Sequence, residues 1–406
     1  MKILSTNCCI AGGGPAGMML GLLLARAGVE VIVLEKHADF LRDFRGDTVH
    51  PSTLTAISEL GLLEDFLRQP HQKAFHITGY VGDAEIMMAD FSKFKIPAPF
   101  IAMMPQWDFL NFLATHAKKY PNFKLMMQAR IVGLIEENGV ITGAKVETSE
   151  GQVQINSKLL IGADGRGSAV RDLAGLIVQD YGAPMDVLWF KISRQNTDTS
   201  DSTGRFLPGK IIALINREDY WQCGYVIPKG ENEKVRLRGL DAFKKKIAEG
   251  VPFFANRVDE LKDWDQIKLL IVKVDLLQKW YRPGLLCIGD AAHAMSPVGG
   301  VGINLAVQDA IAAGNILAEP LLAGNVTEEH LRAVQKRRTW PVKMTQRLQL
   351  AVQKNIIYNI LQDDKPFPVP FAVKMLQRFP ILRRIPAYFI GIGFRPEHVK
   401  DITRGK

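Results

Sequence analysis

The clearest hydrophobic pattern in the chain is an apolar run that ends in a glycine-rich turn. Residues 6–37 read TNCCIAGGGPAGMMLGLLLARAGVEVIVLEKH. The run to Ala11 predicts a buried strand, the Leu- and Ala-rich stretch to Ala27 predicts a helix, and VEVIVLE predicts a second strand. A strand, a glycine turn, a helix and another strand are typical of the start of a parallel α/β sheet.

The same plan returns twice further along the chain. Residues 159–171 read LLIGADGRGSAVR, and residues 285–309 read LLCIGDAAHAMSPVGGVGINLAVQD. Each segment begins as an apolar strand and continues into a glycine turn that carries an Asp. Because ligands bind at the carboxyl ends of the strands in such sheets, three turns of this kind predict one extended ligand across several strand ends.

Between these segments the pattern favours strands. Residues 74–91 alternate and turn at a Gly-Asp pair, and residues 185–228 hold three apolar runs around the polar stretch NTDTSDSTG. Residues 267–276 predict one more strand, and residues 326–361 predict one long helix with Pro341 as a kink or break. We expect an α/β fold with a Rossmann-like, parallel-sheet domain (1–73, 105–180 and 281–340), interrupted by a mixed-sheet domain (74–104 and 181–280) and followed by a helical, basic C-terminal arm (341–406).

The first turn has the spacing of a dinucleotide-binding motif. Gly12, Gly14 and Gly17 follow a strand and open a helix, and Glu35 ends the next strand about 20 residues on, as a ribose partner should. The helix N-terminus would present free N–H groups to a pyrophosphate. The motif alone does not separate NAD from FAD, but carboxylates at two further strand ends suit polyol hydroxyls, and FAD has a ribityl chain that NAD lacks.

Composition adds limits on the class of protein. The chain has 406 residues, 47% hydrophobic and 23% charged, which is ordinary for a folded protein of more than one domain. The net charge of +9 lies almost wholly in residues 340–406. Four cysteines without CxxC spacing predict buried free thiols and fit a cytoplasmic protein. We expect no signal peptide and no membrane span.

Taken in order, the three turns resemble those of FAD-dependent monooxygenases of the p-hydroxybenzoate hydroxylase type, over roughly residues 5–340. The resemblance implies FAD as cofactor and NADPH or NADH as a transient electron donor. In the family, the first turn holds the ADP half, an Asp-Gly turn lies near the pyrophosphate, and a Gly-Asp turn binds the ribityl chain. Carried over to this chain, the cofactor-binding residues are Gly12, Gly14, Pro15, Ala16, Gly17, Glu35, Lys36, Arg45, Gln106, Ile131, Asp164, Gly165, Gly289, Asp290, Pro297, Gly300, Gly302, Ile303 and Asn304.

The last of these residues would lie beside the flavin ring. The N–H groups of Gly302, Ile303 and Asn304 open a predicted helix, whose positive end would stabilise the anionic reduced flavin. Such enzymes need few catalytic side chains, and we expect that role of Arg45, Pro297 and His50. For His50 a capping or turn role is an open alternative. We expect His293 to order the loop through a hydrogen bond rather than to carry protons.

The resemblance implies that NAD(P)H reduces FAD and that a flavin hydroperoxide passes oxygen from O2 to an aromatic or apolar small molecule. Trp189 and Tyr225 are candidate substrate contacts, with plain core packing as the alternative. A reductase of isoprenoid double bonds with the same fold and a flavin-binding protein without turnover remain open. There is no second GxGxxG for a separate nicotinamide domain and no redox-active Cys pair, and CGYVIP at 223–228 lacks the tryptophans of the halogenase signature.

The C-terminal stretch mixes apolar residues with Lys374, Arg378, Arg383 and Arg384. We favour a packed arm that closes the substrate cavity or forms a subunit interface in a homodimer, although a monomer is equally compatible with the sequence. Peripheral contact with anionic lipid is the alternative, because basic apolar segments attract it. No nucleic-acid module is present and no metal site is expected.

Overall fold

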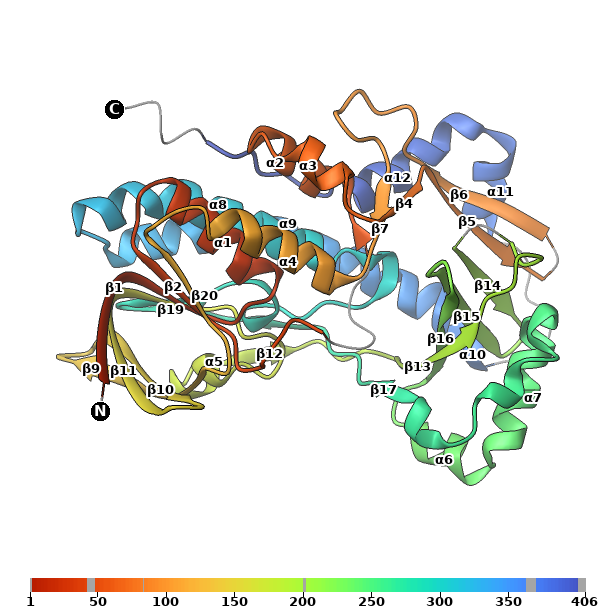
Figure 1. The fold of residues 1–406 in the computed structure, drawn as a ribbon. Coiled ribbons are helices and arrows are strands. Elements are labelled where there is room, and N and C mark those ends of the chain that lie inside the picture. The colour runs from red at the N-terminus through yellow and green to blue at the C-terminus, as the bar shows by residue number, and fades with distance from the viewer. Residues whose placement is uncertain (1, 42–47, 83, 200–201, 363–369, 401–406) are drawn as a thin grey trace.

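The computed structural model describes residues 2–41, 48–82, 84–199, 202–362 and 370–400. Figure 1 shows two large sheets, one at the left with helices above it and one at the right. The first sheet has eight strands and the second has seven. The expected α/β fold, with a parallel sheet, a mixed sheet and a helical C-terminus, is confirmed.

The eight-stranded sheet carries the three glycine turns. Its parallel strands lie in the order β20, β11, β1, β2, β8, with β19 antiparallel at one edge and β10 and β9 extending from β11. The register aligns Cys287, Gly162, Ala11 and Leu34, which end β20, β11, β1 and β2, so these four carboxyl ends meet along one edge. The strands are β1 (Lys2–Ala11), β2 (Val31–Leu34), β8 (Phe123–Met126), β9 (Arg130–Glu137), β10 (Val140–Thr148), β11 (Gly151–Gly162), β19 (Tyr281–Arg282) and β20 (Leu285–Cys287).

Helices cover one face of this sheet (Figure 1). Helix α1 (Pro15–Arg26) packs against α4 (Gln106–Ala117) and α8 (Gly302–Ala323), and α8 packs against α9 (Glu328–Val352). The region Val298–Ala323 is long and apolar enough to cross a membrane, but 83% of its most apolar window is buried inside the fold. The four cysteines are free and buried, which confirms that prediction.

The seven-stranded sheet is mixed, as expected. Its order is β17, β13, β16, β15, β14, β5, β6, and only the β14–β5 pair is parallel. One face packs against α7 (Leu240–Gly250), next to α6 (Asn232–Leu237), and the other meets Ile357 and Ile360 beyond α9. The strands are β5 (His76–Val81), β6 (Ala84–Asp90), β13 (Met185–Ser193), β14 (Thr203–Leu207), β15 (Lys210–Asn216), β16 (Tyr220–Pro228) and β17 (Lys268–Leu270).

Two predicted elements are wrong in detail. Residues 267–276 form two short strands in separate sheets, β17 and β18 (Asp275–Leu277), because side chains bond the segment between them: Asp186 accepts from the Val272 N–H at 2.9 Å, and Lys229 donates to its carbonyl at 2.6 Å. Helix α9 continues through Pro341, and the irregular turn is a π-helix at Gln353–Ile357, followed by α10 (Tyr358–Gln362).

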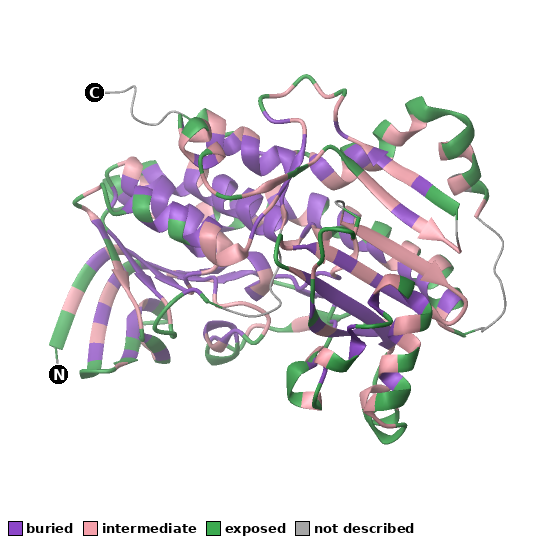
Figure 2. Cartoon of the chain, turned by 45° about the vertical axis from the view of Figure 1, so that its right-hand side comes forward, coloured by how far each residue is buried: buried purple, intermediate pink, exposed green. Residues whose placement is uncertain are grey.

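The remaining elements join the two sheets. A three-stranded sheet of β3 (Thr48–Val49), β7 (Ile101–Met103) and β4 (Gln72–Ala74) lies near α2 (Pro51–Glu59) and α3 (Leu63–Leu67). Strand β12 (Val178–Asp180) pairs with β18, and α5 (Ala169–Leu173) follows the second glycine turn. The C-terminal arm forms α11 (Phe371–Arg378) and α12 (Arg384–Gly391), which lie at the upper right of Figure 2.

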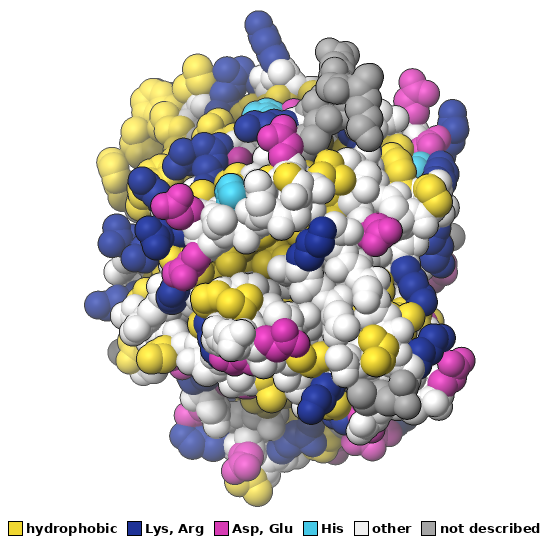
Figure 3. All heavy atoms as spheres, turned by 90° about the vertical axis from the view of Figure 1, so that its left-hand side faces the viewer, with side chains coloured by type: hydrophobic (Ala, Val, Ile, Leu, Met, Phe, Trp, Pro, Cys, Tyr) yellow, Lys and Arg dark blue, Asp and Glu magenta, His cyan; other side chains and the backbone are white. Residues whose placement is uncertain are grey.

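Charge is mixed on the side of the molecule that carries the N-terminal sheet. On the face shown in Figure 3, Lys and Arg side chains are interspersed with Asp and Glu side chains. The excess of basic residues in the sequence therefore does not form one continuous basic surface on that face.

Candidate active site

The three glycines of the first turn differ in what surrounds them. Gly12 has a φ of 107°, and a Cβ there would overlap the backbone of Ala163 in the second turn. A Cβ on Gly17 would overlap the carbonyl oxygen of Gly12. A Cβ on Gly14 would meet nothing within 4 Å. The first and third glycines are therefore required by the fold, whereas the second faces open space at the start of α1.

The end of β2 lies beside this turn. The Glu35 carboxylate accepts hydrogen bonds from the N–H groups of Gly13 and His37, both at 3.1 Å. Glu35 is half-buried and Lys36 is exposed. The backbone N–H of Ala129 donates to the Glu35 carbonyl at 2.9 Å, which brings Ile131, buried in β9, close to the same strand end.

The second and third turns are joined by an ion pair. Arg166 Nε lies 3.1 Å from Asp290 Oδ2, and the Asp290 side chain is 31% exposed. The Asp164 carboxylate is hydrogen-bonded within its own turn. It accepts hydrogen bonds from the Ser168 hydroxyl at 2.5 Å and from the Val170 N–H at 3.2 Å. Burial raises the pKa of Asp164 above its ordinary value. Asp290 is therefore the more available of the two carboxylates.

Small residues bring the first and third turns into contact. A Cβ on Gly289 would lie 3.1 Å from the Cβ of Ala16, near the N-terminus of α1. Pro15 is the first residue of that helix, where its missing N–H costs no hydrogen bond. Gln106 is the first residue of α4 and is half-buried.

The turn before α8 is built from left-handed backbone. Gly299 and Gly300 have φ values of 80° and 64°, and Pro297 precedes them in a half-buried position. A Cβ on Gly300 would lie 2.9 Å from Thr48 Oγ1, whereas a Cβ on Gly302 would meet nothing within 4 Å. The turn is therefore closed toward β3 and open at the first residue of α8. In the second turn, a Cβ on Gly165 would likewise meet nothing within 4 Å.

The start of α8 is anchored on α2. Asn304 is buried, and its Oδ1 accepts from the hydroxyls of Ser52 at 2.9 Å and Thr53 at 2.6 Å. Ile303 is also buried. The first-turn N–H groups of α8 are therefore held in fixed directions.

His50 lies behind this turn instead of facing an open cavity. It is fully buried; one ring nitrogen is 2.7 Å from the Ile390 carbonyl and the other is 3.1 Å from Thr48 Oγ1. Burial lowers the pKa of His50 to about 4, although hydrogen bonds to the backbone of Ile390 and Gly300 act in the opposite direction. The side chain makes no capping bond to α2. Arg45 lies outside the described residues.

The two candidate substrate residues lie on opposite faces of the mixed sheet. Trp189 shares a cluster with Phe206 and with Val298 of the turn before α8. Tyr225 is buried in the other cluster, where its ring meets Phe243 of α7 at 5.2 Å. Tyr225 therefore points away from Trp189 and Val298, because successive side chains of a strand point to opposite faces, and it takes the core packing that the sequence left open as the alternative.

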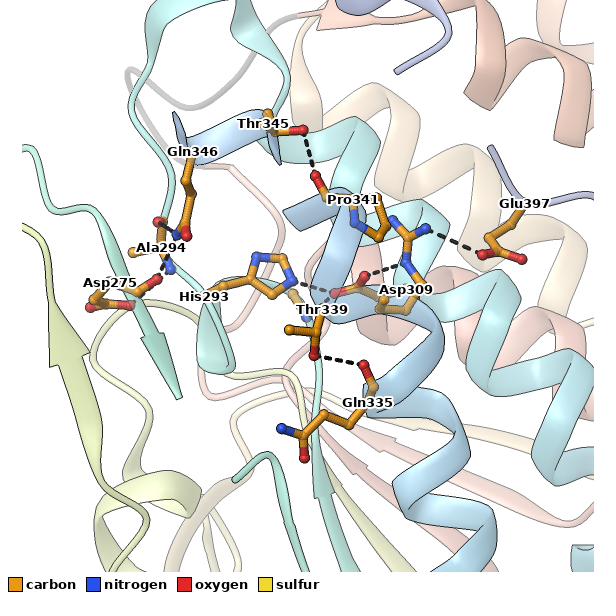
Figure 4. Close-up of polar contacts among 12 residues, drawn as sticks. Asp275, His293, Ala294, Asp309, Gln335, Thr339, Pro341, Thr345, Gln346 and Glu397 are labelled. Carbon is orange, nitrogen blue, oxygen red and sulfur yellow. Dashed lines mark hydrogen bonds and ion pairs between the residues drawn. The ribbon is translucent and has the colours of Figure 1, made fainter. Parts of the chain in front are cut away.

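A buried charged cluster that the sequence analysis missed holds the third turn (Figure 4). Asp309 on α8 accepts from the Gly289 N–H at 3.0 Å and from His293 Nε2 at 2.5 Å. Arg338 on α9 donates to Asp309 at 2.8 Å and lies 3.3 Å from Glu397. The hydrogen bond expected of His293 is thus present, and its partner is Asp309.

A row of glutamines holds the next part of the same loop. Gln349 Nε2 donates to the carbonyl oxygens of Ser296 at 2.9 Å and Val298 at 2.8 Å. Gln346 donates to the carbonyls of Asp275 and Ala294, and Gln353 donates to the Ser296 hydroxyl. The signal in the sequence was three glutamines at helical spacing, 346, 349 and 353, but a polar stripe on a helix is more often exposed.

These features fit an extended dinucleotide with a polyol segment. Positions beside Gly14, Gly165 and Gly302 are open, and the N-termini of α1 and α8 supply N–H groups for a pyrophosphate and an anionic ring. The half-exposed Asp290 supplies a carboxylate for hydroxyl groups. The fold and this edge of the sheet define a dinucleotide-binding protein of the Rossmann type.

Comparison with known proteins agrees with a dinucleotide-binding fold and identifies the dinucleotide as FAD. Residues 5–348 match the FAD binding domain family, and the chain belongs to that family. The chain is 32% identical to the 6-methylpretetramide 4-monooxygenase of Streptomyces rimosus over 347 residues, which are 85% of this chain and 83% of the relative. It is 24% identical to the para-nitrophenol 4-monooxygenase of Pseudomonas sp. strain WBC-3 over 77% of both chains.

Among solved structures, the anhydrotetracycline hydroxylase of Streptomyces rimosus has the same fold, with a TM-score of 0.73 and 21% identity over 96% of this chain and 76% of that chain. The expected family is therefore confirmed, with FAD as cofactor. The chain is a FAD-dependent monooxygenase, and the reductase alternative is not favoured.

Proposed function

We propose that the chain hydroxylates a planar aromatic or polycyclic apolar molecule, using O2 and either NADPH or NADH. The main observation that supports this proposal concerns the face of the mixed sheet on which Trp189 lies. Strand register sets Gly224, Ala213, Gly204 and Gly79 side by side across β16, β15, β14 and β5. The small residues of this row leave room for aromatic side chains from neighbouring positions to lie flat against the sheet.

Aromatic side chains lie on this row. The Trp189 ring is 3.2 Å from where a Gly224 Cβ would stand, and the Phe206 ring is 3.3 Å from where a Gly204 Cβ would stand. Val298, from the turn before α8, packs in the same cluster. An apolar, aromatic wall opposite a flavin-side turn supports an aromatic substrate, as do the names of the two monooxygenase relatives.

Bound FAD would supply electron transfer from the nicotinamide and activation of O2. We propose that the first turn and Glu35 hold its ADP half, that Asp290 binds its ribityl chain, and that the N–H groups of residues 302–304 face its ring. Arg45 would approach the cofactor, and the nicotinamide donor would dock near the Asp164-Gly165 turn. The domain boundaries given above are part of the same proposal.

His50 takes a positioning role in this proposal. With a pKa of about 4 it is neutral near pH 7, and both of its ring nitrogens lie within hydrogen-bond distance of a partner. We propose that it fixes the Gly300 turn while the apolar wall excludes water from the reacting atoms.

A screen of phenolic and polycyclic compounds tests the substrate class. We expect some of them to accelerate NADPH or NADH oxidation by the FAD-loaded enzyme and to gain one oxygen atom, measured by product mass. Oxidation that is stimulated without oxygen in any product would contradict hydroxylation.

Trp189→Ala tests the proposed wall. We expect KM for an accepted aromatic compound to rise roughly ten-fold, because an aromatic pair adds about 0.5–1.5 kcal/mol beyond its area burial. FAD content, measured by absorbance, should stay unchanged. Tyr225→Phe, on the opposite face, is the matched control and should leave KM as it is; equal effects in both variants would refute the assignment of faces.

A further inference from the structure

The C-terminal helices α11 and α12 both contact β6, and both expose large apolar side chains. At these contacts, Ala387 is fully buried near Phe91, and a Cβ on Gly391 would lie 2.9 Å from the Phe91 ring. Away from these contacts, five large apolar side chains of residues 371–388 are exposed to solvent: Phe371 (78%), Ile381 (68%), Ile385 (54%), Phe379 (46%) and Tyr388 (45%).

Basic residues accompany these side chains. Lys374, Arg378 and Arg384 are exposed, and the Arg378 guanidinium lies 5.8 Å from the centre of the Phe379 ring. Residues 365–396 contain six Lys or Arg and no Asp or Glu. Within the described part of the chain, no carboxylate forms an ion pair with these three side chains. We call the five apolar and three basic residues the arm surface.

The arm surface is held in place by the rest of the molecule. Arg383, between the two helices, donates to the Leu376 carbonyl at 3.0 Å and lies 3.5 Å from Met87 Sδ on β6. Beyond α12, Glu397 pairs with Arg337 at 2.7 Å. The exposed apolar side chains are therefore presented on an anchored segment, and their exposure is not the result of a free chain end.

The positive charge of the arm surface distinguishes between two possible partners, a second copy of the chain and an anionic lipid bilayer. In a symmetric dimer this surface would meet its own copy, so a surface with three cations and no ion-paired carboxylate would be placed against an identical one. An anionic lipid surface satisfies both parts of the pattern, because apolar side chains enter the acyl boundary while Lys and Arg pair with headgroups. Tyr388 suits the same boundary, where tyrosine is enriched.

We propose that the arm surface docks the protein peripherally on anionic lipid bilayers. The docked arm lies beside β6 of the mixed sheet, and α12 contacts His50 behind the flavin-side turn through Ile390. If the proposed function holds, an apolar substrate could then pass from the bilayer to the sheet face that carries Trp189. The docking itself does not depend on the enzyme's activity.

Vesicle co-sedimentation of the FAD-loaded full chain tests this proposal. We expect it to pellet with vesicles of phosphatidylcholine containing about 30% phosphatidylglycerol and to stay in solution with pure phosphatidylcholine. Pelleting should fall when salt is raised from about 0.1 M to about 1 M, because the Debye length shortens from about 10 Å to about 3 Å. A chain that stays in solution with the anionic vesicles would overturn the proposal.

A triple variant, Phe371→Ser with Ile381→Ser and Ile385→Ser, locates the docking surface. We expect its partitioning to fall roughly ten-fold or more, with FAD content unchanged. The matched control is Leu237→Ser with Ile177→Ser, which are 87% and 65% exposed elsewhere on the molecule and should pellet as the unchanged chain does. Equal pelleting of the triple variant, or its conversion from dimer to monomer without any vesicle effect, would refute lipid docking in favour of another role for this surface.

Discussion

One loop of this protein is held by two chemically different supports. Residues 289–293 rest on a buried charged cluster in which Asp309 binds Gly289, His293 and Arg338. Residues 294–298 rest on neutral amides, the row of Gln346, Gln349 and Gln353. Both supports use side chains of α9, namely Arg338 in the charged cluster and Gln346 and Gln349 in the amide row, and both act on the loop that leads to the open end of α8.

The two supports should respond differently to change. A buried carboxylate beside a buried arginine balances a charge that cannot be hydrated, so removing it leaves Arg338 uncompensated. An amide donates a neutral hydrogen bond, and its loss exposes only unsatisfied carbonyl groups. Burial acts to raise the pKa of Asp309, but His293 and Arg338 outweigh it and lower that pKa below its ordinary value. The charged support therefore has a pH dependence that the amide row lacks.

Asp309→Asn should have the largest effect. We expect the free energy of unfolding to fall by about 3–5 kcal/mol, because a buried arginine loses its main counter-charge. Thermal and urea denaturation of the FAD-loaded protein measure this loss. FAD retention should fall with it, because the Gly289 N–H and His293 lose their shared acceptor.

The double variant Asp309→Asn with Arg338→Met is the control for charge. If the cost arises from the uncompensated arginine, the double variant should recover part of the lost stability, since Glu397 keeps Arg337. A double variant less stable than Asp309→Asn alone would show that the hydrogen bonds, and not the charge balance, carry the stability.

The sequence predicted the glycine turns at the strand ends, but it did not predict the charged cluster and the amide row that hold the third turn. Gly12, Gly17 and Asp290 were recognisable because the backbone and the ligand both constrain residue type at fixed spacing. Asp309 and Arg338 are 29 residues apart on different helices, and nothing local signals that they meet. Tyr225 could not be separated from Trp189 because apolar residues continue on both faces of β16, so alternation did not reveal which face points to the turn.

Likewise, the strand expected at 267–276 failed because side chains of Asp186 and Lys229 replaced the ladder bonds around Val272. The pattern of apolar and polar residues along the chain cannot predict tertiary hydrogen bonds of this kind. The fold class survived such local errors because three strand–turn segments in a fixed order determine the parallel sheet.

His50 provides a second test, through pH. Its pKa is about 4 in the folded protein against an ordinary value of 6.5, so the unfolded chain binds more protons between these values. Stability due to neutral His50 is therefore complete above about pH 6.5 and falls as the pH drops toward 4, by up to about 3 kcal/mol. Asp309 has a lowered pKa, so its contribution is lost only below about pH 4. Urea denaturation measured as a function of pH separates the loss of stability due to His50 from the loss due to Asp309.

His50→Gln is the matched variant, because an amide can still bond to Thr48 or Ile390 but does not titrate in this range. We expect it to flatten the stability profile between about pH 6.5 and 4 while leaving the acid limb below that unchanged. An unaltered profile in the variant would show that another group titrates in this window.

Gln349→Leu should have the smallest effect and isolates the amide row. The carbonyls of Ser296 and Val298 would each lose a donor, so we expect a loss of about 1–3 kcal/mol with no change in pH dependence. Gln335→Leu on the same helix is the control, because it also removes two backbone hydrogen bonds but to residues 278–280, away from the turn. If the row positions the flavin-side turn, only Gln349→Leu should shift the absorbance spectrum or the reduction potential of bound FAD. Equal shifts in both variants would mean that α9 acts on the cofactor as a whole and that no single glutamine sets the turn.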